Sequence, residues 1–150
     1  MVIALIYVSR RTSNREPSKA DLDAWVARSS ERNAKLNVRG ALLVTSHHIA
    51  QILEGPELAI DELMSDIRRQ PGHDQVTVID CRPIDSYRFT DWCFAYWGTA
   101  TYMDEKIATV LKKHDALAAA GDTTQLFDLM RMLARECRNQ KGPIGNPPQH

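Results

Sequence analysis

The sequence predicts an α+β fold: a ferredoxin-like five-stranded mixed sheet with two helices on one face and a C-terminal helical pair capping the other. Three observations predict it. Strand-like and helix-like segments follow one another as β-α-β-β-α-β-β, the ferredoxin-like order with one extra strand. Two more amphipathic segments come next, and the second face of the sheet offers the apolar surface they need. The length of 150 residues suits one domain.

Five segments are predicted as strands. Residues 2–9 form an almost continuous apolar run, which is typical of a central strand covered on both faces. Residues 38–46 and 48–55 are expected to pair around a tight turn. Residues 76–84 alternate in polarity, and residues 93–100 supply the fifth strand.

The helices between these strands are predicted from their start signals. Ser18 is expected to open the first helix, with Asp21 as its partner in a capping box. Gly55 is expected to cap the second helix, with Pro56 in its first turn.

Two further helices are predicted after the last strand. The first starts near Thr101 with Asp104 as the capping partner, and the second follows Gly121 with Asp122 as its cap. We therefore expect a core in residues 1–100, a helical cap of the same domain in residues 101–138, and a disordered Gly- and Pro-rich tail in residues 139–150.

Composition narrows the function. Acidic and basic residues number 19 each, so the charge balance indicates neither a nucleic-acid nor an anionic membrane partner. The apolar N-terminus is short and no basic segment precedes it, which favours a strand over a signal peptide or membrane span. Three cysteines, odd in number and widely spaced, indicate reduced thiols in a cytoplasmic protein.

Gln51 is the first candidate functional residue, because it lies inside a strand that is otherwise expected to be buried. A buried amide without partners costs about 1–3 kcal/mol. Its face of the strand is shared with Ile49 and Leu53, and Tyr7 belongs to the corresponding face of the first strand. If these strands are neighbours, the phenol and the amide can meet. A purely structural Tyr–Gln hydrogen bond remains the plainer interpretation.

Asn33, beside Arg32 at the end of the first helix, is a second candidate. Its plainer interpretation is a cap or turn former, and its alternative is a ligand edge that presents C=O and N–H side by side. His47 and His48 are not expected to bind a metal, because adjacent strand residues point to opposite faces. The sequence has no GxSxG, Gly-rich phosphate loop or HExxH, so an enzyme is not predicted.

Four residues occur in a characteristic order along the chain: Tyr7 in "LIYVS", Asn33 in "RNAKLNVRGALLV", Gln51 in "IAQILEG" and Trp92 in "YRFTDWCF". This combination resembles the BLUF family of blue-light sensors, which bind FAD non-covalently. The resemblance covers about residues 2 to 98, and the helical pair after it resembles the cap of short, stand-alone members.

The resemblance implies a flavin held between the first two helices. Its photoactive residues would be Tyr7, Gln51 and Trp92. Its flavin-binding residues would be Tyr7, Leu22, Arg32, Asn33, Gln51, Ile67, Arg68 and His73. Excited flavin would take an electron and then a proton from the phenol, and the glutamine would return in another orientation or tautomer. A small reversible red shift would follow, with output through a homo-oligomer or an unidentified signalling protein.

The chain departs from the family pattern at three positions. Phe94 stands where Met is usual, Gly72 where a basic residue is usual, and Arg32 where Asn or His is common. Arg32, or Arg68 with Arg69, would then support the flavin phosphates.

Two other functions remain as alternatives. The first is a light-silent flavin-binding or protein-interaction module on the same fold. The second is an acylphosphatase-like hydrolase that would use Arg10, Arg11 and Arg15 near the first strand.

Overall fold

The computed structural model describes residues 1–12, 19–98, 101–113 and 119–140. The order of its elements is the predicted one. Along the chain these are β1 (Val2–Arg11), α1 (Lys19–Lys35), β2 (Arg39–Val44), β3 (His48–Pro56), α2 (Glu57–Arg69), β4 (His73–Pro83), β5 (Trp92–Trp97), α3 (Thr101–Lys113) and α4 (Ala119–Gln140).

The five strands form one mixed sheet in the order β4-β1-β3-β2-β5. β2 and β5 run parallel, and the other neighbouring pairs are antiparallel. In the β1–β3 ladder Tyr7 lies directly opposite Gln51. The expectation that these two strands are neighbours is therefore confirmed.

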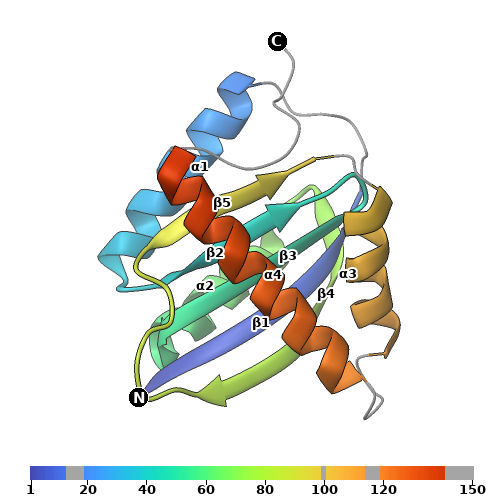
Figure 1. Ribbon diagram of the computed structural model, residues 1–150. Helices are drawn as coiled ribbons and strands as arrows, with labels where there is room; N and C mark the ends of the chain where they lie inside the picture. Colours follow the sequence, from blue (N-terminus) through green and yellow to red (C-terminus); the bar gives the residue numbers. More distant parts are fainter. Residues whose placement is uncertain (13–18, 99–100, 114–118, 141–150) are drawn as a thin grey trace.

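Helices cover both faces of the sheet (Figure 1). Because successive strand residues point to opposite faces, each strand supplies two separate cores. Tyr7 belongs to the core on the side of α1 and α2, together with Ile60 and Leu63 of α2. Val8 belongs to the core on the side of α3 and α4, with Ile107 and Met130. The predicted placement of the C-terminal pair on the second face is confirmed.

β5 changes face partway along its length. Its register with β2 pairs Leu42 with Phe94 but Leu43 with Tyr96, so β5 carries one extra residue at that point. Phe94 belongs to the core under α1 and α2, whereas Tyr96 belongs to the core under α3 and α4. The strand therefore presents bulky side chains to both layers.

Two predicted helix starts are wrong. Gly55 does not cap α2, because it remains in β3 opposite Ile3, and Pro56 is the residue just before the helix. A side chain at position 55 would be crowded, because a Cβ there would lie about 3.0 Å from the Asn37 carbonyl oxygen. α4 begins two residues before Gly121, so Gly121 and Asp122 lie inside it.

Asp104 does not act as the predicted capping partner. Its carboxylate accepts hydrogen bonds from the turn between β2 and β3: from the Thr45 hydroxyl and from the backbone N–H of His47. The Nδ1 atoms of His47 and His48 also approach it, at 2.9 and 3.1 Å. The expectation that these rings point apart is wrong, because His47 lies in the turn rather than in the strand. Asp104 thereby fastens α3 to the sheet.

Some expectations fall outside the described residues, namely the cap at Ser18, residue Arg15 and the tail beyond residue 140. Within the ranges that the structure does describe, no helix is long and apolar enough to cross a membrane.

Candidate functional site

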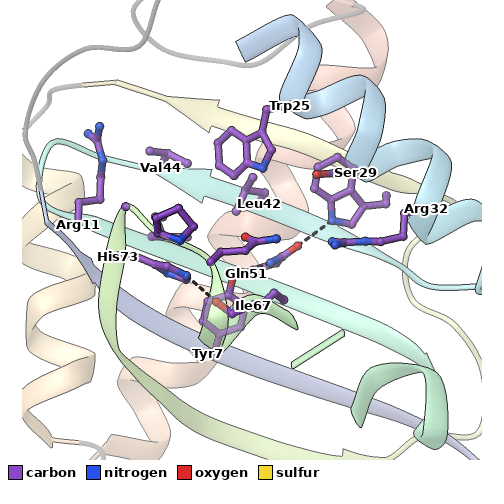
Figure 2. Close-up of a pocket in the computed structure, with 15 residues that line it drawn as sticks. Tyr7, Arg11, Trp25, Ser29, Arg32, Leu42, Val44, Gln51, Ile67 and His73 are labelled. Atoms are coloured by element: carbon purple, nitrogen blue, oxygen red, sulfur yellow. Dashed lines mark hydrogen bonds between the residues drawn. The ribbon is translucent and has the colours of Figure 1, made fainter. Parts of the chain in front are cut away.

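A cavity of about 300 Å³ lies between the sheet and the helices α1 and α2 (Figure 2). This volume is at the lower end of the range of small-molecule sites. Its floor is formed by strand residues, among them Tyr7, Leu42, Gln51 and Trp92. Its walls are formed by Trp25, Ser29 and Arg32 of α1 and by Ile67, Gln70, Pro71, Gly72 and His73 at the end of α2 and beyond.

A chain of hydrogen bonds crosses the floor. The indole Nε1 of Trp92 donates to Oε1 of Gln51 at 2.9 Å, and Nε2 of Gln51 donates to the Tyr7 hydroxyl at 2.6 Å. The orientation of the amide follows from chemistry, because an indole N–H can only donate and therefore needs the amide oxygen in front of it. Gln51 is thus held in one orientation by Trp92.

Tyr7 is buried almost completely. Burial raises the pKa of its phenol far above the ordinary value, and the smaller effects of the Gln51 hydrogen bond and the Arg32 charge do not reverse this. The phenol therefore keeps its proton at every physiological pH. A neutral phenol beside a ligand cavity can supply both an electron and a proton.

Asn33 and Arg32 carry polar atoms that are buried without a partner. Asn33 is 1% exposed, and its Oδ1 receives no hydrogen bond in the described part of the chain. The same holds for Nε of Arg32. Leaving such groups unpaired costs about 1–3 kcal/mol each. A buried acceptor and a buried donor on consecutive residues of α1 suit a ligand edge with complementary N–H and C=O groups, such as the pyrimidine-like ring of a flavin.

His73 lines the cavity, but both its ring nitrogens are bound within the protein. Nε2 lies 2.9 Å from the carbonyl oxygen of Ile67, which can only accept, so Nε2 carries a proton. Nδ1 lies 2.7 Å from Oγ of Ser9, and in the neutral ring it accepts from that hydroxyl. His73 therefore fixes the cavity wall and does not present a nitrogen to it.

The structure brings together most of the predicted site residues. Those that line the cavity are Tyr7, Arg32, Gln51, Ile67, His73 and Trp92. Asn33 does not line it, although its side chain is buried and follows Arg32 in α1. Arg68 does not line it and donates to the carbonyl oxygen of Val76. Leu22 belongs to α1, and its side chain lies outside the described residues.

Sequence reasoning missed Trp25 as a site residue. A large aromatic side chain inside the predicted first helix was the signal that could have identified it. In the structure Trp25 lines the cavity and meets the ring of Phe94 edge-on, with ring centroids 6.0 Å apart.

Arg11 lines the cavity too, but its guanidinium donates to the carbonyl oxygens of Thr45 and Ser46 and lies over Trp97. These contacts make Arg11 part of the wall. Among the described residues, no cluster of three or more His, Cys, Asp or Glu side chains is arranged to hold a metal ion.

Comparisons with known proteins agree on one family. Residues 2–95 match the model of the BLUF family, described as sensors of blue-light using FAD. The chain is 32% identical over 114 residues, 76% of its length, to the photoactivated adenylate cyclase subunit beta of Euglena longa, and it covers 13% of that relative.

Two solved structures are similar to the chain. Klebsiella pneumoniae BlrP1 with FMN and cyclic diGMP is 37% identical with a TM-score of 0.54, over 59% of this chain and 23% of that one. The dark-state structure of BlrB, a BLUF protein, is 28% identical with a TM-score of 0.63, over 89% and 96% of the two chains.

Proposed function

Because the chain belongs to the BLUF family, whose members bind FAD, we propose that it senses blue light through a bound FAD and signals through contacts with other proteins. The observation that carries this proposal is the hydrogen-bonded chain of Trp92, Gln51 and Tyr7 on the cavity floor. This arrangement sets the neutral phenol of Tyr7 and the amide of Gln51, which can reverse its orientation, beside the cavity under α1 and α2.

The residues present suit a flavin. Oδ1 of Asn33 and Nε of Arg32 would pair with the polar edge of the ring, and both lack a partner within the described residues. Trp25 and Ile67 would contact its faces from the two helices. When bound, the flavin supplies absorption of blue light and, in its excited state, a strong oxidant.

The Gln51 amide is the switch in this proposal. In the present orientation its Nε2 donates to Tyr7, so Gln51 cannot receive the phenolic proton there. Rotation or tautomerisation would turn an acceptor toward Tyr7. Rotation would also turn Nε2 toward Trp92, and two N–H donors would then face each other. The state of Gln51 is therefore coupled to the position of Trp92, and the pair forms a two-state element.

The output would start in β5, because Trp92 is its first residue. Phe94, two residues later, lies against Trp25 of α1. We propose that a second copy of the chain or another protein receives the signal, and we assign no catalytic step to these residues. The cyclase activity in the name of the Euglena relative belongs to a protein of which this chain covers 13%.

Visible absorption tests the proposal. The purified protein is loaded with FAD, and its spectrum is recorded before and after blue light. A reversible red shift is expected. Bound flavin without any shift would favour the alternative function, a light-silent flavin-binding module. The observation that supports this alternative is Phe94 at the position where Met is usual. A protein that takes up no FAD would contradict both.

A Gln51→Leu variant tests the switch itself. It should still bind flavin but lose the red shift, because Leu can neither donate to Tyr7 nor accept from Trp92. Gln125→Leu on the exposed surface of α4 is the matched control and should shift normally. A normal shift in Gln51→Leu would show that another residue performs the rearrangement.

A further inference from the structure

A second cavity of about 470 Å³ adjoins the first, between α1 and the segment that follows α2. Its lining residues are Trp25, Arg28, Ser29, Arg32, Gln70 and Pro71. Arg28 is the one lining residue that the inner cavity does not share. A ligand whose ring lies in the inner cavity can therefore extend into the outer one past Arg32.

The two cavities are lined by positive charge. Arg28 and Arg32 line the outer one, and Arg11 and Arg32 the inner one. In the part of the chain that the structure describes, no Asp or Glu lines either cavity, although the chain contains 19 acidic residues. This local excess contrasts with a net charge of zero.

The arginines of the outer cavity are not neutralised by their own helix. Glu31, the carboxylate nearest in sequence to both, pairs with Lys35 at 3.1 Å. Across the described residues neither Arg28 nor Arg32 takes part in an ion pair, and Nε of Arg32 is buried without a partner. Two like charges spaced i and i+4 on a helix repel each other unless an anion lies between them.

The other basic residues near this end of the site are already engaged. Arg69 pairs with Asp66, and Arg68 donates to the carbonyl oxygen of Val76. The C-terminal end of α2 lies close to this end, since Gln70 and Pro71 line the outer cavity, and a helix C-terminus is unfavourable for an anion. An anion in the outer cavity would therefore be held from α1.

We propose that the outer cavity is a phosphate subsite, in which Arg28 and Arg32 hold the phosphate of the flavin's side chain. Guanidinium groups one helical turn apart suit the several oxygens of a phosphate, because each can donate two parallel hydrogen bonds. This inference rests on the proposed function. It goes beyond that function because it makes the protein select phosphorylated flavins over riboflavin.

A competition experiment tests the subsite. The full-length protein is equilibrated with equal amounts of riboflavin and FMN, which differ by one phosphate, and in a second mixture with riboflavin and FAD. Free flavin is removed, and the bound flavins are separated and quantified. The wild type should retain the phosphorylated flavin in roughly tenfold excess, the effect of a charge-assisted hydrogen bond. Added salt should reduce this excess.

Arg28→Gln should lower the bound ratio severalfold, with Arg32 retaining the rest, and should leave riboflavin binding unchanged. Lys106→Gln removes one positive charge from α3, outside both cavities, and should keep the wild-type ratio. An equal ratio in the wild type, or an unaltered ratio in Arg28→Gln, would overturn the subsite while flavin binding stands. A protein that retains no flavin of any kind would instead overturn the proposed function.

Discussion

Trp92→Phe should release the orientation of the Gln51 amide. The substitution keeps an aromatic ring but removes the N–H that donates to Oε1 of Gln51. Gln51 is 6% exposed, so its oxygen would lose a partner without gaining water. The cost to the free energy of unfolding is about 1–3 kcal/mol. The preference for the present amide orientation falls by the net value of one hydrogen bond, about 0.5–1.5 kcal/mol, which is roughly a 2- to 12-fold change in the ratio of the two orientations.

Two measurements test the loss of stability and the change in amide orientation. Urea denaturation monitors the free energy of unfolding, and light-minus-dark absorption spectra monitor the flavin. The variant should be less stable, and its red shift should be smaller, because part of the population already holds the rotated amide in the dark. Its dark recovery should also be slower, because Trp92 no longer favours the return of the Gln51 oxygen.

Trp97→Phe is the matched control. Trp97 lies in the same strand and is buried, but its ring lies beneath the Arg11 guanidinium. Its replacement should lower stability and leave the spectra unchanged. If Trp92→Phe gives a wild-type shift and recovery, the indole does not orient Gln51, and the coupling between the two residues is refuted.

Three further predictions concern other parts of the molecule. Tyr7→Phe should keep flavin but abolish the red shift, and should cost about 1–3 kcal/mol because Nε2 of Gln51 loses its acceptor; a normal shift would exclude Tyr7 as the donor. Glu54→Gln should lower the free energy of unfolding by roughly 3 kcal/mol in urea denaturation, because it breaks the buried pair with Arg88; a change below about 0.5 kcal/mol, typical of exposed positions, would contradict this. Burial raises the pKa of Asp104, but the hydrogen bonds it accepts from the β2–β3 turn outweigh this and hold the pKa below 3.8. Its stabilising effect should therefore be complete above pH 3.8 and be lost as the pH falls through the lower folded value, so the stability gap to Asp104→Asn should narrow in acid; a gap that stays constant with pH would contradict the shift.

The meeting of Tyr7 and Gln51 was predictable from the sequence. Strand alternation places each of them on a definite face, and a polar side chain buried on one strand needs a partner on the next. The bond from Trp92 to Gln51 was not predictable in this way. It depends on the parallel pairing of β5 with β2, a non-local feature that sets Trp92 opposite Gly40.

The errors have a common physical origin. Sequence patterns report local preferences, and tertiary contacts override them. Asp104 has the spacing of a capping residue, but the β2–β3 turn lies close enough to donate hydrogen bonds to its carboxylate. Arg28 resembles any exposed arginine until α1 is placed beside the segment after α2, which creates the outer cavity.

The sheet also constrains how a change at Gln51 could reach the C-terminal helices. The two faces of the sheet are lined by alternating residues. A side chain that rotates on one face therefore changes the packing on the other face only if the backbone moves. β5 is suited to move, because it is an edge strand that pairs with β2 alone among the residues that the structure describes. It begins with Trp92 on the cavity side, and it packs against α4 on the other side.

The segment before β5 strengthens this connection. Arg88 pairs with Glu54, a buried residue of the same strand as Gln51, and its guanidinium lies 4.1 Å from the ring centroid of Phe127 in α4. A displacement of Trp92 would therefore act on a strand whose preceding loop is attached both to β3 and to α4. We expect α4, rather than α1 or α2, to be the surface on which the lit and dark states differ for a partner.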